Sequence, residues 1–372
     1  MVFLFYFGYF WVLYLFHKRA QKKVKSLAFF YPTVSLIVPT FNEEKIISKK
    51  IQNIAELDYP NDKMEVIFVD GHSTDQTTNI IRREVEKYKK SVRLISQDRR
   101  EGYTRAIIDG FSESKGEIII LTDAASYHHL DAIKHLVKHF SNPQIGAVTG
   151  KEIILGNNKK IGEELEQSYR FFYDFMRKAE TEIDSTPDSK GEILALRRDI
   201  FNALAIRLKA SPNASFDSCM PYEAKLMGYR TVYDETAKYY EYAPSSFRDR
   251  NKQQVRRGTF LVGALLMYRN MIMNRKYGRF GLIILPAHFV MECLLPWLFL
   301  LGAGCLLILT LLDPIKTLPF WMIFFVGAIV SKRSRNFLLS FIQSQWALIV
   351  AIFRLVSHKG HLYIDTITST RK

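Results

Sequence analysis

Short apolar segments alternate with amphipathic ones between Thr33 and Ile154. The apolar segments have the length of buried strands and cover 34–38, 64–69, 92–96, 118–121 and 145–149. In the segments between them, apolar residues recur every three or four positions, as they do on one face of a helix. Ile47, Ile51 and Ile54 are an example. Strict alternation of strand and helix predicts a mostly parallel sheet with helices on both faces.

The pattern continues less regularly to residue 245. A helix rich in Tyr and Phe, a strand, a helix, a turn and a strand are expected at 161–182, 190–196, 201–208, 212–215 and 230–233. Asp217 opens a further helix that Gly228 closes, because glycine commonly ends a helix. We therefore expect one α/β domain over residues 30–245.

Four segments are apolar enough to enter a membrane, at 1–16, 282–312, 318–330 and 337–356. As a helix the first spans about 24 Å, somewhat less than the ~30 Å hydrocarbon core. The second is long enough to span with tilt, and Glu292 inside it needs a partner or a polar cavity. We expect an N-terminal transmembrane anchor over 1–16 and transmembrane or membrane-associated helices over 281–357.

Charge indicates how these segments are oriented. The net charge is +15, and basic clusters at 18–25 and 332–335 flank apolar segments. Such clusters mark the cytoplasmic side of a membrane protein. No basic residue precedes the first segment and no small-residue cleavage site follows it, which favours an uncleaved anchor over a signal peptide. We expect a multi-pass protein of the cell membrane with its α/β domain in the cytoplasm.

The end of the chain leaves two topologies open. If residues 337–356 lie flat or re-enter the membrane, the tail at 358–372 is cytoplasmic, which its basic residues favour. If they cross, the tail emerges outside. Residues 246–280 are basic and amphipathic, which favours interfacial helices in the headgroup plane of an anionic leaflet over a solvated surface helix. Two of the three cysteines fall in an apolar stretch, so no disulfide framework is expected.

Two acidic residues end predicted strands. Asp70 follows Phe68-Val69, and Asp123 follows the apolar run 118–121. In open α/β sheets the carboxyl edge of the strands is where ligands bind. The sequence lacks both GxGxxG and GxxxxGK[ST], which argues against a Rossmann dehydrogenase and a P-loop enzyme. No aromatic-basic platform for nucleic acid is evident either, so sugar-nucleotide chemistry becomes a good candidate.

Five stretches, in order, resemble the successive motifs of family 2 glycosyltransferases. They are VSLIVPTFNEE (34–44), VIFVDGHSTDQT (66–77), GEIIILTDAAS (116–126), FDSCMPYEAKLMGYRTVYDETAKYYE (216–241) and KQQVRRG (252–258). The resemblance implies an inverting, membrane-bound enzyme with a GT-A fold, a Rossmann-like α/β domain. It also implies a nucleotide-sugar donor, most simply a UDP-sugar, and a lipid-linked or glycan acceptor.

The resemblance assigns roles to individual residues. Pro39, Thr40 and Glu43 correspond to the loop that holds the base and ribose, and Asp70 to the carboxylate that accepts hydrogen bonds from them. Asp123 corresponds to the first Asp of the DxD motif. That residue places a Mg²⁺ or Mn²⁺ ion against the diphosphate, where the cation neutralises the charge of the leaving group.

The remaining roles lie in the last two motifs. Asp217 corresponds to the general base that takes the proton from the acceptor hydroxyl; helix capping is its alternative role. Gln253, Arg256 and Arg257 correspond to a segment near the diphosphate. A guanidinium group suits a diphosphate because its N–H donors form a fixed fork.

Three positions depart from the family pattern. Ala125 replaces the second acid of DxD, so Ser126, His128 or water is left to complete a metal shell. Tyr103 stands where a lysine is expected, and Arg105 or a neighbouring arginine is left to supply that charge. Arg257 replaces a tryptophan that stacks on the acceptor in chain-building members, which favours transfer of one sugar. The alternatives are a processive polysaccharide synthase and a catalytically inactive membrane assembly protein.

Overall fold

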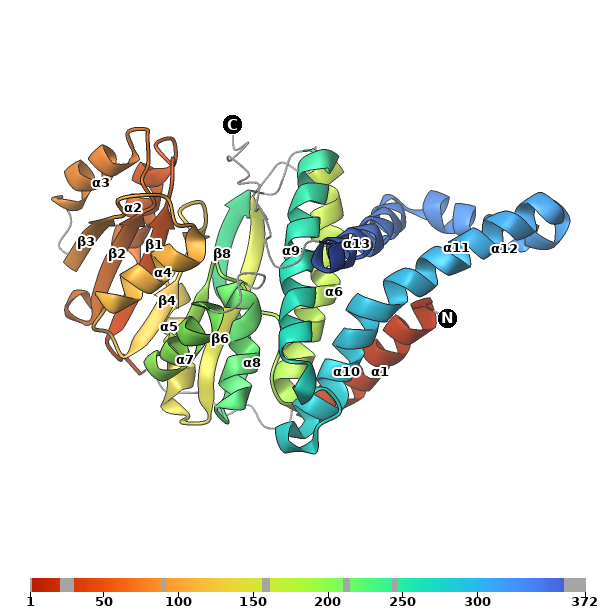
Figure 1. The fold of residues 1–372 in the computed structure, drawn as a ribbon, viewed down its shortest axis with the longest axis horizontal. Coiled ribbons are helices and arrows are strands. Elements are labelled where there is room, and N and C mark those ends of the chain that lie inside the picture. The colour runs from red at the N-terminus through yellow and green to blue at the C-terminus, as the bar shows by residue number, and fades with distance from the viewer. Residues whose placement is uncertain are drawn as a thin grey trace.

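The computed structural model describes residues 2–20, 30–87, 91–155, 161–209, 215–242 and 246–357. Most of the turn expected at 212–215, part of the basic cluster at 18–25 and the tail at 358–372 lie outside these residues. The described chain forms an α/β unit joined by two long helices to a group of apolar helices (Figure 1).

Eight strands of the described chain form one sheet, in the order β3-β2-β1-β4-β7-β6-β8-β5. The strands are β1 Val34–Thr40, β2 Met64–Asp70, β3 Ser91–Ser96, β4 Ile118–Leu121, β5 Tyr127–His128, β6 Ile145–Leu155, β7 Leu194–Arg197 and β8 Arg230–Tyr242. The pairs β1–β2, β1–β4, β2–β3 and β6–β8 are parallel. The predicted α/β fold with a mostly parallel sheet is confirmed.

One strand departs from the parallel arrangement at the centre of the sheet. β7 lies antiparallel between β4 and β6. It was expected to begin at Lys190, but the chain at 190–193 turns before the strand starts at Leu194. The predicted start was wrong because the apolar residues 193–196 are preceded by a polar loop, which faces the site described below.

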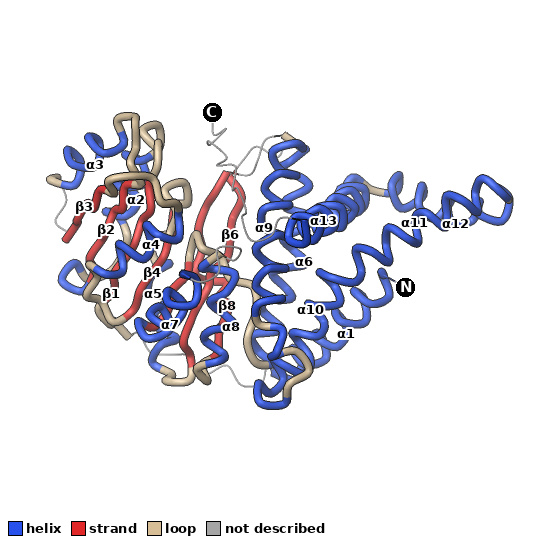
Figure 2. Tube along the Cα trace, viewed as in Figure 1, coloured by secondary structure: helices blue, strands red, loops and turns tan. Residues whose placement is uncertain are grey.

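Helices cover both faces of the sheet (Figure 2). Those around the sheet are α2 Ile47–Glu56, α3 Thr77–Val85, α4 Tyr103–Ser112, α5 Ala132–Val137, α7 Arg198–Lys209 and α8 Phe216–Leu226. Successive β1 residues enter two different cores, since Leu36 and Val38 pack with α2 whereas Ile37 packs with α4. This alternation is what a strand buried on both faces requires.

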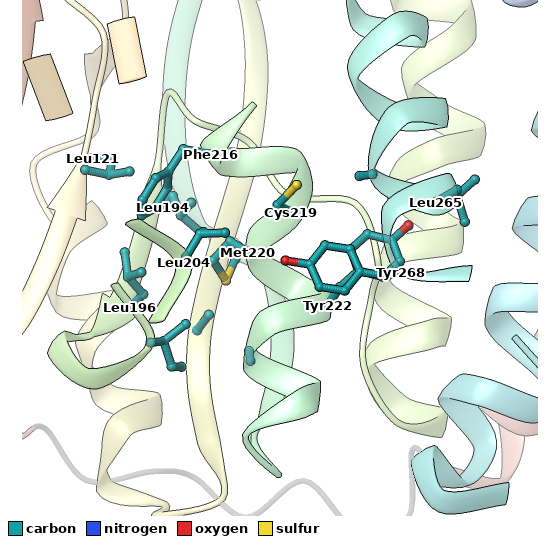
Figure 3. Packing of buried hydrophobic residues seen from close by; sticks show 14 of the residues in the cluster. Leu121, Leu194, Leu196, Leu204, Phe216, Cys219, Met220, Tyr222, Leu265 and Tyr268 are labelled. Carbon is teal, nitrogen blue, oxygen red and sulfur yellow. The ribbon is translucent and has the colours of Figure 1, made fainter. Parts of the chain in front are cut away.

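Two long helices, α6 Ile161–Ile183 and α9 Phe247–Met267, stand beside the sheet. Figure 3 shows how α8 joins the sheet to α9 through buried apolar side chains. Tyr222 on α8 stacks on Tyr268, just after α9, with ring centroids 5.1 Å apart. The core that contains Leu121 and Leu194 therefore continues into Leu265 and Tyr268.

The remaining helices are apolar and lie on the far side of α6 and α9. They are α1 Val2–Ala20, α10 Leu285–Phe289, α11 Leu295–Leu312, α12 Pro314–Val330 and α13 Lys332–Ser357. Helix α1 packs on α6, and α13 packs on both α9 and α6. The partner expected for Glu292 is His288, 2.7 Å away, whose other ring nitrogen lies 2.7 Å from Glu180 on α6.

Two helical stretches are long and apolar enough to cross a membrane, Phe280–Leu312 and Ser334–Ser357. Only 11% of the most apolar window of the first is buried inside the protein. The N-terminal apolar helix Phe5–Phe16 is shorter. These helices give the α/β unit an apolar side of the kind that a membrane covers.

Candidate active site

Three predicted site residues lie at the carboxyl ends of neighbouring parallel strands. Thr40 ends β1 beside Asp70 on β2, and Asp123 follows β4 on the other side of β1. Asp70 is nearly buried and accepts hydrogen bonds from the backbone N–H and the hydroxyl group of Ser73, at 3.0 and 2.5 Å. The fold thus brings these residues to one edge of the sheet, as expected for a ligand site.

The loop after β1 closes over the loop after β2. Glu43 donates its backbone N–H to the Thr77 hydroxyl at 2.8 Å, and the Thr40 carbonyl accepts from the N–H of Gly71 at 2.8 Å. Pro39 lies within β1 and is half-buried. The guanidinium group of Arg100 lies 3.7 Å above the Phe41 ring, which gives this edge a flat cationic surface.

A buried lysine hydrogen-bonds to both ends of the loop from Thr122 to Ser126, which carries Asp123. Lys50 on α2 is completely buried and donates to the Thr122 hydroxyl at 2.8 Å and to the Ser126 carbonyl at 2.5 Å. Burial lowers the pKa of Lys50 to about 7, although the charge of Asp123 acts to raise it. One side chain therefore fixes both ends of this loop.

His128 and Ser126 turn into the interior rather than toward a bound ligand. His128 Nε2 lies 3.0 Å from the Thr122 hydroxyl and 2.9 Å from the Glu192 carbonyl. Burial, together with the charge of Lys50, lowers the pKa of His128 to about 3, so the ring is neutral. The Ser126 hydroxyl donates to the Asp123 carbonyl at 3.0 Å. The expectation that these side chains complete a metal shell therefore has no support in their orientation.

The charges of Asp123 and Asp217 both act on the hydroxyl group of Tyr103, which begins α4. Burial of the hydroxyl and the charges of Asp123, Asp217 and Glu192 raise the pKa of Tyr103 well above its ordinary value. A Cβ atom added to Gly191 would lie 3.3 Å from Asp217 Oδ2 and 3.4 Å from the Tyr103 hydroxyl oxygen. Asp217 and the Tyr103 hydroxyl group thus both lie close to Gly191.

Asp217 lies in the first turn of α8, after the N-cap residue Ser215. The Ser215 side chain accepts from the Ser218 backbone and donates to the Asp217 carboxylate. The cap is therefore Ser215, which leaves the Asp217 side chain available for another role. Burial raises the pKa of Asp217 despite the hydrogen bond from Ser215, and the charge of Glu192 raises it further. A carboxylate with a raised pKa is a better proton acceptor.

Of the predicted cationic residues, Arg257 reaches Glu192, the neighbour of Gly191. Its guanidinium group lies 3.2 Å from Glu166 and 3.8 Å from Glu192. Gln253 and Arg256 are on the same helix, half-buried and exposed respectively. Arg105 instead forms ion pairs with Asp109 on α4 at 2.7 Å and with Glu101, just before the helix, at 3.3 Å. Arg105 is therefore not directed at Asp123 and Asp217, where it was expected to supply the charge of the lysine that Tyr103 replaces.

The residues around Asp123 provide few protein ligands for a metal ion. The described residues contain no group of three or more His, Cys, Asp or Glu side chains that could hold one. Ala125, which replaces the second acid, is buried. A divalent cation at Asp123 therefore fits only if donor phosphates and water supply most of its oxygen ligands, which is common for Mg²⁺.

Three contributors were not identified from the sequence: Lys50, Gly191 and Glu192. Lys50 alone had a detectable signal, since it falls on the same helical face as Ile47, Ile51 and Ile54. A lysine at such a position is either exposed at the edge of the face or buried with partners. Gly191 and Glu192 lay inside the wrongly extended strand.

Comparison with known proteins bears on the family and the fold. The family model described as glycosyl transferase family 2 matches residues 35–204. A solved mannosyltransferase, PcManGT from Pyrobaculum calidifontis, in complex with GDP-Man and Mn²⁺, aligns over 96% of this chain and 97% of its own, with a TM-score of 0.80 and 27% identity. Residues 35–204 form a glycosyl transferase family 2 domain. The predicted GT-A fold and the predicted family are confirmed, and the match indicates a glycosyltransferase enzyme.

Curated relatives match over a shorter region. A probable glycosyltransferase of Bacillus subtilis, YdaM, is 32% identical over 35% of this chain and 32% of its own length. A beta-monoglucosyldiacylglycerol synthase of Nostoc is 31% identical over 44% of this chain and 35% of its own length. The chain thus matches about a third of the length of these relatives. The glycosyltransferase domain is shared, whereas the substrates have to be argued from this chain.

Proposed function

We propose that this family 2 glycosyltransferase transfers one sugar from a nucleotide-sugar donor to a lipid-linked or glycan acceptor, with inversion, at a membrane surface. The observation that carries the proposal is that Asp123, after β4, and Asp217, beside Gly191, both act electrostatically on the Tyr103 hydroxyl. One aspartate lies at the sheet edge where the family holds the diphosphate, and the other has the raised pKa of a proton acceptor. Such a pair serves a single displacement.

In this reaction the acceptor oxygen forms a bond to the anomeric carbon while the bond from that carbon to the diphosphate breaks. Asp217 takes the proton of the acceptor hydroxyl, and the electron pair leaves with the diphosphate. Thr40, Glu43 and Asp70 hold the base and ribose, and Arg257, Arg256 and Gln253 line the approach from α9. A divalent cation beside Asp123 would neutralise the charge of the leaving group.

The donor nucleotide has two candidates. A UDP-sugar is the prediction from the sequence. The similar structure of the Pyrobaculum mannosyltransferase holds GDP-Man, which favours GDP-mannose as the second candidate. Both leave a nucleoside diphosphate, so the chemistry at Asp123 is shared.

The acceptor class is supported by the apolar side of the molecule. A small cavity of about 50 Å³ lies between α1, α6 and α13, lined mostly by apolar side chains such as Tyr6, Phe172 and Phe341. The Nostoc relative is named for a glycolipid product. A membrane-embedded acceptor would meet the catalytic domain beside two candidate membrane helices, and the basic clusters that flank them favour the cytoplasmic face for that domain. Arg257 in place of an aromatic stacking residue favours one transfer over chain growth.

The test uses the full chain in detergent or nanodiscs with Mn²⁺, a panel of UDP- and GDP-sugars, and a lipid extract. A radiolabelled product that moves into the lipid phase is expected with one donor. Asp217→Asn is expected to reduce kcat by about 10²–10⁴-fold, because the general base is lost, while the dissociation constant of the donor stays unchanged. Asp199→Asn is the matched control. Asp199 lies on α7, and its carboxylate accepts a hydrogen bond from the Tyr229 hydroxyl.

Three outcomes would contradict parts of the proposal. Full turnover by Asp217→Asn removes Asp217 from the mechanism. A ladder of growing products supports the processive alternative. A folded protein that binds no nucleotide sugar and transfers none supports the inactive assembly protein.

A further inference from the structure

A proline interrupts the hydrogen bonding of α8 shortly after the proposed general base. Pro221 lies inside this helix and is buried. In an α-helix the carbonyl group of residue 217 accepts from the backbone N–H of residue 221. Proline has no N–H, and its ring also crowds the carbonyl group four residues earlier. The backbone carbonyl of Asp217 therefore lacks the donor that the helix would otherwise supply.

The missing donor comes from outside the helix. The hydroxyl group of Ser189, in the loop before β7, donates to the Asp217 carbonyl at 2.6 Å. Ser189 is only 6% exposed, so solvent has little access to this hydrogen bond. Because an unpaired carbonyl group away from water is costly, the bond from Ser189 replaces the one that Pro221 removes.

The loop that carries Ser189 is itself fixed to the sheet. The backbone N–H of Lys190 donates to the hydroxyl group of Thr149 on β6 at 3.0 Å. Further along the loop, the Glu192 carbonyl accepts from Nε2 of His128 on β5 at 2.9 Å, since a carbonyl oxygen can only accept. Ser189 thus ties the first turn of α8 to a loop that two strands already hold.

The change of donor alters what the Asp217 backbone is fixed to. A bond from residue 221 would hold the Asp217 carbonyl only relative to its own helix. The carboxylate of Asp217 is likewise held from the same turn, by the Ser215 hydroxyl. The bond from Ser189 is therefore a contact that fixes this turn relative to the sheet, where the donor is expected to lie.

We infer that Ser189 is a positioning residue of the transfer reaction, which acts by holding the backbone of Asp217 where Pro221 has removed the helical hydrogen bond. This inference rests on the proposed function, in which Asp217 takes the proton of the acceptor hydroxyl. A general base has to lie within hydrogen-bond reach of that proton. A displacement of about 1 Å at a reacting group can cost a hundredfold in rate, so the turn that carries the base has to stay in place.

The test is a double-mutant cycle in the full chain, with transfer measured as for the proposed function. Ser189→Ala is expected to lower kcat about 10- to 100-fold, while the KM of the donor stays unchanged because the donor site is not altered. Ser189→Thr keeps a hydroxyl group and is expected to recover most of this loss. Pro221→Ala returns an N–H group to the helix, so in that background Ser189→Ala is expected to lower kcat less than about threefold.

The matched control is Ser114→Ala. Ser114 is 7% exposed, and its hydroxyl group donates to the Phe111 carbonyl at 2.7 Å. It precedes β4, at the opposite end of that strand from Asp123. This variant is expected to lower the melting temperature and to keep its kcat, which separates a loss of stability from a misplaced base.

Two kinetic results overturn the inference alone: wild-type kcat in Ser189→Ala, or an equal loss of kcat from Ser189→Ala in both backgrounds. If Ser189→Ala does not fold, the chain with both Ser189→Ala and Pro221→Ala decides. That chain is expected to fold and to transfer sugar, and its failure overturns the inference. A wild-type chain that transfers no sugar, or full turnover by Asp217→Asn, overturns the proposed function and this inference together.

Discussion

Lys50 shows what a single buried charge does in this domain. An ammonium group without solvent contact is costly unless its N–H groups are hydrogen-bonded, and two oxygen atoms of the loop at Thr122 and Ser126 accept from it. Its pKa of about 7 lies below the value of about 10.4 in an unfolded chain. Between these values the unfolded chain binds more protons, so stability rises with pH in that range.

Replacing Lys50 with Met should remove this pH dependence. From pH 7 to pH 10, the free energy of unfolding of the wild type should rise relative to that of Lys50→Met, by at most about 1.4 kcal/mol per pH unit. Denaturant unfolding at several pH values measures the difference. Parallel curves for the two proteins would show that Lys50 is not buried with a lowered pKa.

The site also shows how far residues could be predicted individually. Asp70, Asp123 and Asp217 were recognisable because each follows a strand or opens a helix within a known motif. Tyr103 was visible only as a departure from that motif. Its significance depends on Gly191 and Asp217, which are 88 and 114 positions away in the sequence, and only the folded sheet brings them together.

At the scale of elements, α6, α9 and α13 are joined by one arginine. Arg250 on α9 is completely buried, with Glu166 of α6 at 2.9 Å and the Ser340 hydroxyl of α13 at 2.7 Å. Burial alone would raise the pKa of Glu166, but Arg170, Arg257 and Arg250 lower it to about 2. Because Arg257 also lies near Glu192, this ionic cluster connects the apolar helices with the candidate site.

Arg250→Met is expected to destabilise the protein by about 3–5 kcal/mol, because removing one partner of a buried ion pair leaves the other uncompensated. Unfolding in detergent, followed by tryptophan fluorescence, measures this loss. Arg256→Met changes an exposed residue of the same helix and should stay within about 0.5 kcal/mol of the wild type. Equal stability of the two variants would contradict the role given to Arg250.

Element types were predicted better than their ends. The strand at 118–121 was placed correctly, since four consecutive apolar residues bounded by polar ones define it. β8 runs on to Tyr242, well past the predicted end at residue 233. Its outer half carries charged residues and pairs with β6 and β5, so tertiary pairing extends it where the hydrophobic pattern does not.

One side of the molecule is polar, and the other exposes large apolar side chains. In Figure 1, α11 and α12 extend away from the α/β unit, and their large apolar side chains are exposed, for example Leu307 at 57%, Leu311 at 78% and Ile315 at 81%. Exposed apolar surface on this scale marks a membrane or protein interaction site. The basic cluster at 332–335, which follows α12, suits an anionic leaflet.

Lysines at Leu307 and Leu311 should therefore weaken membrane insertion, since each costs about 2.5–3.5 kcal/mol near the centre of a spanning helix. Alkaline carbonate extraction of membranes is the measurement, and a larger share of the double variant than of the wild type should move to the soluble fraction, although Ser334–Ser357 can still span. Tyr242→Lys, at an exposed position of β8, should be extracted to the same extent as the wild type. Equal extraction of the double variant and the wild type would contradict the insertion of α11.

The stacked rings of Tyr222 and Tyr268 also bear on how the enzyme can be produced. A fragment ending at residue 245 would keep every family motif except the last, yet it would leave the outer side of α8 without α9 and expose Tyr222 to solvent. Such a fragment should aggregate in the expression host. A water-soluble catalytic unit should therefore keep residues through Ile284. The exposed apolar side chains after Ile284 should be replaced by polar ones.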